Sequence, residues 1–150
     1  MVFDANLVLV DGSVNWTYAN IVTAGYGTPT STTRNSGGFA TLDLMALGGT
    51  PAMGVAIVLI IPTGAGSTDA LTLLAQSSDS ATFASGVHNL AGFDLAAATS
   101  GIILGSESPC TVIRRVATVD RYLRVYAVVT TGDDFGATQV LVNPWAFGRL

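Results

Sequence analysis

The sequence carries little charge and has no lysine. Only 11% of its 150 residues are charged, against about 25% in an average soluble domain, while 49% are hydrophobic and the mean hydropathy is +0.54. All six basic residues are arginine, which suits protein interfaces because its planar guanidinium binds carboxylates at two points and is weakly hydrated. A codon bias in a GC-rich genome explains the same count equally well. A chain this apolar is expected to bury surface in an oligomer or a larger assembly.

Two classes of partner are excluded by what is missing. The longest apolar run, Met53–Ile61, is bounded by Pro51 and Pro62 and is far shorter than the roughly 20 residues needed to span a bilayer. The formal net charge of −4 and the pI of about 4.5 argue against nucleic acid, whose binding requires a basic patch. We therefore expect neither a membrane nor a nucleic acid as partner.

Residue types that perform catalysis or bind metals are also scarce. His88 is the only histidine and Cys110 the only cysteine, so an internal disulfide is excluded and a catalytic triad or zinc site lacks partners. We expect His88 to be a solvent or loop histidine and Cys110 a small core residue. Asp133 and Asp134 fit a hairpin turn better than a calcium site. The sequence predicts no enzyme, no cofactor and no metal site.

The clearest pattern in the chain is the alternation of Arg121–Thr130, RYLRVYAVVT. One face of this segment is apolar and is expected to lie in the core: Leu123, Val125, Ala127 and Val129. The other face carries aromatic and charged residues: Tyr122, Arg124, Tyr126 and Val128. A two-residue period in β-branched and aromatic residues is typical of a strand with two different faces. We interpret the segment as a central strand whose outward face contacts a partner.

The rest of the chain is also patterned as short strands. Roughly eight to ten of them recur at spacings of about 8–12 residues, as in a sandwich or barrel. Val55–Ile61 is continuously apolar and is expected to be buried on both faces. Gly86–Leu95 is weakly patterned, and Phe93–Thr99 is the best, though weak, helical segment. With no linker, the sequence predicts one all-β sandwich domain over residues 1–150, in which Ala24–Gly38 is a long loop or arm rich in Gly, Ser and Thr.

A cluster of arginine and tyrosine is the best candidate for an interface. Arg114–Arg115 and Arg121–Arg124 are expected on two adjacent strands, and these residue types are enriched in binding hot spots. An ordinary solvated face, paired across strands with aspartates such as Asp120, is the alternative. Near the C-terminus, a short tail with large apolar groups docks either on its own core or on a partner. The candidate interface residues are Tyr122, Arg124, Tyr126, Arg114, Trp145 and Phe147.

Three segments together resemble one protein family. The chain begins MVFDANLVLVDGS, with a D-x-x-L-x-L-x-D spacing; its middle contains LTLLAQSSDSATF; and its C-terminal third reads DRYLRVYAVVTTGDDFGATQVLVN. Their order resembles the small capsid cement, or decoration, proteins of tailed bacteriophages. The resemblance covers most of the chain except Ala24–Gly38, and the late RYLRV segment is its most specific part.

The resemblance implies a jelly-roll-like β-sandwich with no catalytic residues and no cofactor. It also implies a homotrimer on the outer capsid surface of the virion, where it would bind the major capsid protein, bridge neighbouring subunits and stabilise the shell. From the residues alone, a carbohydrate- or receptor-binding β-sandwich module of a virion is the alternative. Such a module needs an exposed aromatic platform, for which Trp16, Tyr18, Tyr26 or Trp145 are available.

Overall fold

The structure is a computed structural model, and it describes residues 8–12, 41–47, 54–62, 70–96, 110–129 and 135–144. Within these ranges the chain forms strands and one short 3-10 helix, η2, at Leu44–Leu47. The strands are β1 (Val8–Asp11), β2 (Leu42–Asp43), β3 (Val55–Ile61), β4 (Ala70–Ser78), β5 (His88–Ala96), β6 (Cys110–Val116), β7 (Tyr122–Val129) and β8 (Gln139–Pro144).

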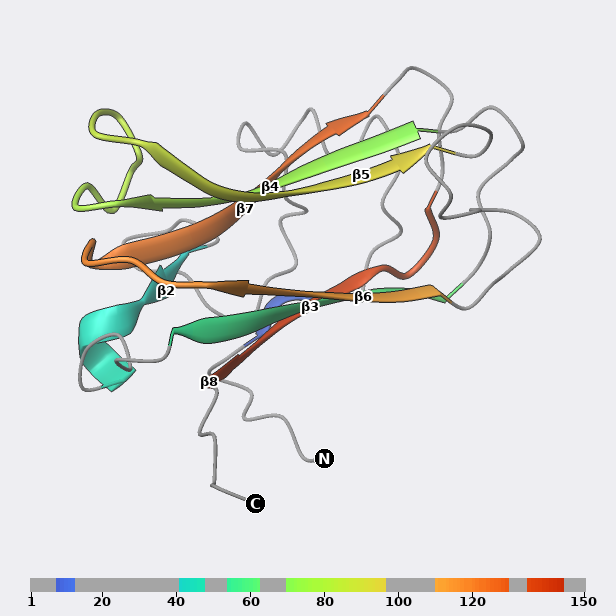
Figure 1. The fold of residues 1–150 in the computed structure, drawn as a ribbon, viewed down its shortest axis with the longest axis horizontal. Coiled ribbons are helices and arrows are strands. Elements are labelled where there is room, and N and C mark those ends of the chain that lie inside the picture. The colour runs from blue at the N-terminus through green and yellow to red at the C-terminus, as the bar shows by residue number, and fades with distance from the viewer. Residues whose placement is uncertain are drawn as a thin grey trace.

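These strands make two four-stranded antiparallel sheets that lie one above the other in Figure 1. One sheet has the order β1-β8-β3-β6 and the other β2-β7-β4-β5. Apart from the β4–β5 hairpin, each described strand is followed by a strand of the opposite sheet. Eight antiparallel strands that cross between two sheets in this order form a jelly-roll-like sandwich. The predicted all-β sandwich is therefore confirmed.

The core lies between the two sheets and is made by alternate residues of facing strands. On β3, Ile57 and Leu59 are fully buried and stand opposite Val142 and Val140 of β8. From the other sheet, the buried residues that join the same core include Leu73, Ala75, Phe93, Leu123 and Val125. Complete burial of one such aliphatic side chain stabilises the fold by about 1.5–3 kcal/mol.

Strands β3 and β7 fit the sequence expectation most closely. Along β3 every residue but Ile60 is buried, as a continuously apolar strand predicts. Strand β7 lies between β2 and β4 and is thus an interior strand of its sheet. Its residues Leu123 and Val125 are fully buried on the core side, which confirms the central strand read from the alternation of Arg121–Thr130.

Strand β5 lies in Gly86–Leu95, whose pattern is weak, and the helical prediction for Phe93–Thr99 is wrong over its described part. His88–Ala96 is a nine-residue strand, so the part of Phe93–Thr99 that the structure describes is extended rather than helical. The pairing with β4 runs along the whole of β5, with one irregularity between Ala75 and Gln76. A long ladder of cross-strand contacts decides the conformation here, because the local pattern is too weak to do so.

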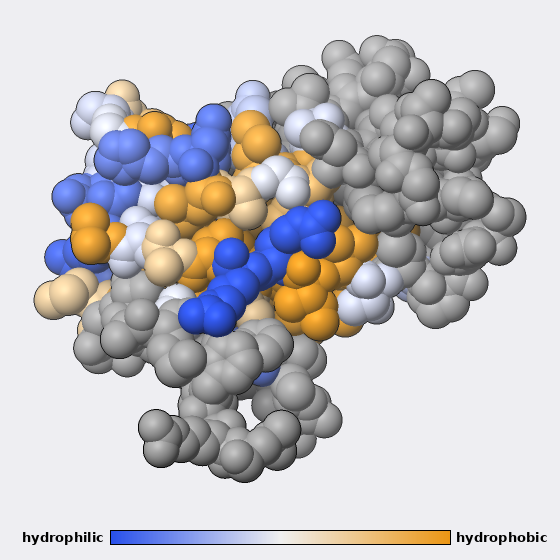
Figure 2. Space-filling model, viewed as in Figure 1, coloured by the Kyte–Doolittle hydropathy of each residue, from blue (hydrophilic) through white to orange (hydrophobic). Residues whose placement is uncertain are grey.

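The two arginine clusters do not lie on adjacent strands, which corrects another expectation. Arg114 and Arg115 belong to β6, whose partner is β3. Arg124 belongs to β7 in the opposite sheet, and Arg121 directly precedes β7. The Arg114 guanidinium carbon lies 5.6 Å from the ring centroid of Phe93 on β5, so this side chain reaches across from one sheet to the other. In Figure 2, strongly hydrophilic residues likewise cross an otherwise apolar area of the sandwich.

Several predicted features fall outside the described residues. These are the loop or arm Ala24–Gly38, the C-terminal Trp145 and Phe147, and the aromatic residues Trp16, Tyr18 and Tyr26. Among the residues that the structure does describe, no helix has the length and apolar character needed to cross a membrane.

Candidate functional site

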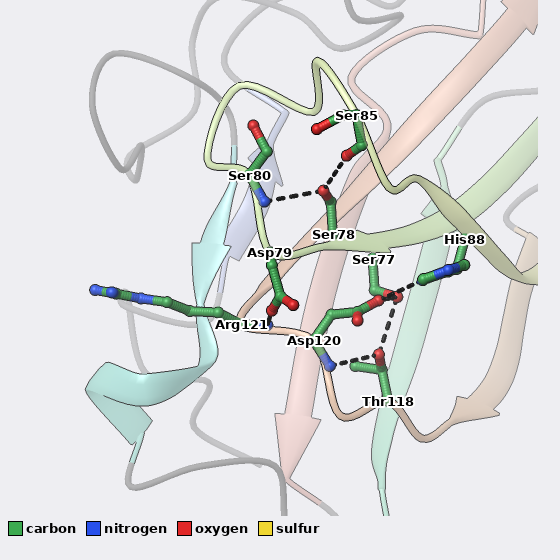
Figure 3. Close-up of polar contacts among 9 residues, drawn as sticks. All are labelled: Ser77, Ser78, Asp79, Ser80, Ser85, His88, Thr118, Asp120 and Arg121. Carbon is green, nitrogen blue, oxygen red and sulfur yellow. Dashed lines mark hydrogen bonds and ion pairs between the residues drawn. The ribbon is translucent and has the colours of Figure 1, made fainter.

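One end of the sandwich gathers three connections: the β4–β5 hairpin, the β6–β7 turn and η2, at the left of Figure 1. A polar cluster fixes this end, and we define it as Ser77, His88, Thr118 and Asp120. Ser77 and His88 stand opposite each other where β4 ends and β5 begins. Thr118 and Asp120 come from the β6–β7 turn. Figure 3 shows these side chains converging from the two connections.

The carboxylate of Asp120 is the centre of the polar cluster. Its Oδ2 accepts a hydrogen bond from Ser77 Oγ at 2.5 Å and lies 2.8 Å from His88 Nδ1. Thr118 Oγ1 donates to Ser77 Oγ at 2.9 Å and accepts from the Asp120 backbone N–H at 3.0 Å. Ser77 is fully buried, whereas the His88 ring is 65% exposed. The hydrogen bonds thus close a ring that joins β4 to the β6–β7 turn.

The electrostatics of the polar cluster favour an ionised Asp120. The hydrogen bond from His88 is the largest cause that lowers the pKa of Asp120, the hydrogen bond from Ser77 is the next, and burial opposes them. An ionised carboxylate can only accept hydrogen bonds, so His88 must carry its hydrogen on Nδ1. In the neutral ring this leaves Nε2 as the acceptor.

The arrangement of Ser77, His88 and Asp120 limits the chemistry that the polar cluster can perform. An aspartate that orients a histidine is also part of the hydrolytic triad, but there the histidine Nε2 activates a hydroxyl nucleophile. Here the hydroxyl of Ser77 bonds to the carboxylate and is fully buried. Ser77 is therefore not arranged as the nucleophile of such a triad, and its hydroxyl instead joins β4 to the β6–β7 turn. Among the described residues, no group of three or more His, Cys, Asp or Glu could hold a metal ion.

Sequence reasoning missed this cluster. His88 was expected to be a solvent or loop histidine; its ring is indeed largely exposed, but it begins a strand and bonds to Asp120, 32 positions away. No spacing or motif links two residues so far apart. The hint that was available is that Asp120 stands just before the RYLRV segment, and Ser77 in the SSDSATF segment.

Arg121 ties η2 and the hairpin to the same end. Its guanidinium forms a two-point pair with Asp43, with Nε to Oδ1 at 3.1 Å and Nη2 to Oδ2 at 2.8 Å. Its backbone N–H donates to Asp79 Oδ1 at 3.0 Å, and its carbonyl accepts from the Leu44 N–H at 2.8 Å. Asp43 Oδ1 also accepts from the Met45 N–H at 3.0 Å. Three connections are thus joined through one residue.

The β4–β5 hairpin is held by its own serines and by a buried phenylalanine. Ser78 Oγ donates to the Ser85 carbonyl at 2.8 Å and accepts from the Ser80 N–H at 3.0 Å, as Figure 3 shows. Phe83 has a positive φ of 54°, a backbone conformation that residues other than glycine rarely adopt. Its ring is nonetheless buried, because it packs on Arg124 of the neighbouring strand.

The predicted interface residues of β7 are engaged within the chain. The Arg124 guanidinium carbon lies 4.2 Å from the ring centroid of Phe83 and 5.5 Å from that of Tyr126. Its Nε donates to Gln76 Oε1 at 2.9 Å. Arg124 and Tyr122 are buried, and Tyr126 is half-buried. The structure brings Tyr122, Arg124 and Tyr126 onto one face and leaves Arg114 on the other sheet; the role of this face in an interface stays a prediction.

Comparison with family models, with curated proteins and with solved structures gives no match for this chain. Its function must therefore be inferred from its own residues and their arrangement.

Proposed function

We propose that the chain is a structural virion protein that acts as a capsid cement, or decoration, protein. In this role it binds the outer surface of a tailed-phage head and bridges neighbouring subunits of the major capsid protein. It works as a homotrimer and stabilises the shell without catalysing a reaction.

The observation that carries this proposal is that two of the segments that resemble the family, LTLLAQSSDSATF and DRYLRV, contact each other in the fold. Phe83 of SSDSATF packs on Arg124 of RYLRV, with 4.2 Å between the guanidinium carbon and the ring centroid. Ser77 of the same segment bonds to Asp120, one residue before RYLRV. Two of the three segments that carry the resemblance therefore meet at the same end of the fold. The jelly-roll-like architecture is one that viral capsid proteins use, although a fold alone does not determine function.

The mechanism is mechanical. Each copy buries surface on several capsid subunits, and threefold association links several weak contacts, so that the assembly is retained far more strongly than one copy alone. The apolar, charge-poor composition fits a chain that functions within an assembly, because exposed apolar surface favours association.

A binding experiment with assembled shells tests the proposal. The purified chain would be mixed with shells of the major capsid protein encoded in the same genome and sedimented through a cushion, and its native mass would be measured separately. We expect a homotrimer that sediments with the shells and raises the temperature at which they disrupt. Shells that neither retain the chain nor gain heat resistance would contradict the proposal.

A further inference from the structure

The end of the sandwich that the polar cluster fixes also presents apolar side chains to solvent. We define the loop end as the exposed Met45, Val87 and Val119 together with the charged Asp43, Asp79 and Arg121. Building on the proposed function, we infer that the loop end is the surface that meets the capsid shell. The partner it fits is a protein surface with apolar recesses surrounded by basic side chains.

Exposure of large apolar side chains is concentrated at the loop end. Four such residues are exposed among the described ones: Met45 at 64%, Val87 at 38%, Val119 at 100% and Ile113 at 50%. Ile113 lies on β6, but the other three belong to η2, the hairpin and the β6–β7 turn. Single exposed apolar residues are ordinary on any surface, whereas apolar residues that gather in one place mark interaction sites.

Hydrogen bonds link the three backbone segments that carry these apolar residues. Val87 precedes His88 and Val119 precedes Asp120, and the side chains of His88 and Asp120 are 2.8 Å apart. Met45 is linked to the same turn because its N–H bonds to Asp43, whose carboxylate pairs with Arg121. On the left of Figure 2, apolar residues accordingly stand among hydrophilic ones.

The loop end is also rigid before any partner arrives. Asp120 ties the β6–β7 turn to β4 and β5, and Arg121 ties it to β2 and to the hairpin. A surface that is already ordered loses less conformational entropy on binding, which strengthens association for the same contact area. Val119, fully exposed, contributes nothing to the core of its own chain, so its apolar surface is available to a partner.

The charge of the loop end indicates which partner it suits. The loop end carries a net negative formal charge, because the Arg121 guanidinium balances Asp43, with which it pairs, while the exposed carboxylate of Asp79 accepts a hydrogen bond from the backbone N–H of Arg121, which is uncharged. Charged side chains beside exposed apolar ones resemble the polar rim and apolar centre of protein interfaces, and the exposed carboxylate of Asp79 makes this surface acidic. It repels phosphate groups and attracts lysine and arginine, so a protein with basic side chains fits and a nucleic acid does not.

The test compares two aspartate substitutions in shell binding. Val119→Asp places a charge in the loop end, and Ile113→Asp places the same charge on β6 as a matched control. Because both positions are exposed, neither change should affect folding, which native mass and thermal melting would verify. We expect Val119→Asp to weaken shell binding about tenfold or more, as loss of a central contact does. Ile113→Asp should bind within about twofold of the unmodified chain.

The outcomes separate this inference from the function on which it rests. If the unmodified chain does not bind shells, the proposed cement function and this inference are both refuted. If it binds and Val119→Asp binds equally well, the cement function stands and the loop end is not the contact. Loss of binding in Ile113→Asp alone, or to the same degree in both variants, would also overturn the inference.

Discussion

Ser77 and Asp120, 43 positions apart in the chain, are joined by a 2.5 Å hydrogen bond between the serine hydroxyl and the aspartate carboxylate. Both are buried. The bond fastens the end of β4 to the turn between β6 and β7, and through it the hairpin and the turn become one rigid piece. The stability of the fold and the order of its loop end therefore depend on the same contact.

Removal of both partners of this bond should cost less than the sum of the two single removals. Asp120→Ala leaves the buried Ser77 hydroxyl without its acceptor, and we expect the free energy of unfolding to fall by about 1–3 kcal/mol. The double variant Ser77→Ala with Asp120→Ala should lose less than the sum of the single changes, because the two residues share one contact. Urea denaturation of the four proteins measures this. Strict additivity would show that the bond contributes nothing.

The stability of the chain should depend on pH through Asp120. Its pKa in the folded chain is lowered by His88 and Ser77, so the stabilisation is fully present above the unfolded pKa of about 3.9. It is lost as the pH falls through the folded pKa, because the unfolded chain then binds the proton more readily. Thermal melts from pH 7 to pH 2 should show the unmodified chain and Asp120→Asn converging at low pH. A difference that stays constant over that range would contradict this.

Substitution of Arg124 by lysine should destabilise the fold even though the positive charge is kept. The planar guanidinium of Arg124 lies over the ring of Phe83, is within 5.5 Å of the ring centroid of Tyr126 and bonds to Gln76, a geometry that a lysine ammonium does not reproduce. We expect Arg124→Lys to lower the free energy of unfolding by about 1–2 kcal/mol.

The exposed Arg115 supplies the control for that experiment. Arg115 is exposed on β6, where the contacts of a charged side chain contribute little, so Arg115→Lys should change the free energy of unfolding by less than about 1 kcal/mol. Equal effects of the two substitutions in chemical denaturation would argue against the stacked geometry.

Two glycines with positive φ provide a matched pair. Gly54 has a φ of +80°, and a Cβ there would stand 2.2 Å from the Val116 carbonyl oxygen. Gly86 has a φ of +60°, but a Cβ there would meet nothing within 4 Å. Gly86→Ala should therefore cost only the backbone strain of about 1 kcal/mol, and Gly54→Ala clearly more, about 3 kcal/mol or above. Thermal melts compare the stability of the two variants, and a larger loss of stability in Gly86→Ala than in Gly54→Ala would contradict the prediction.

The elements that local pattern predicts are those in which one face or both are apolar without interruption. Val55–Ile61 has the bounds expected for it, and Leu123 and Val125 of β7 face the core as the alternation requires. What local pattern misses is the path between strands. Only five residues, 117–121, separate β6 from β7, which is a spacing typical of a hairpin, yet the chain crosses here from one sheet to the other.

The candidate site was less predictable than the strands for the same reason. Asp120 acquires its partners Ser77 and His88 because the crossing connection brings the turn over the end of β4. That encounter depends on the packing of two sheets, and no residue near Asp120 in sequence signals it. The arginines at 114–115 and 121–124 are close in sequence and are expected on adjacent strands, but the crossing between sheets separates them.

The position of β8 between β1 and β3 has a consequence for synthesis on the ribosome. Strand β1 has no other partner among the described strands, so its pairing must wait until residues 139–144 have emerged. Until then only the β4–β5 hairpin joins strands that are consecutive among those described, and long-range pairing of this kind is slow. The nascent chain therefore carries β1 without its partner strand while residues 12–138 are synthesised, and unpaired apolar strands of this kind favour aggregation.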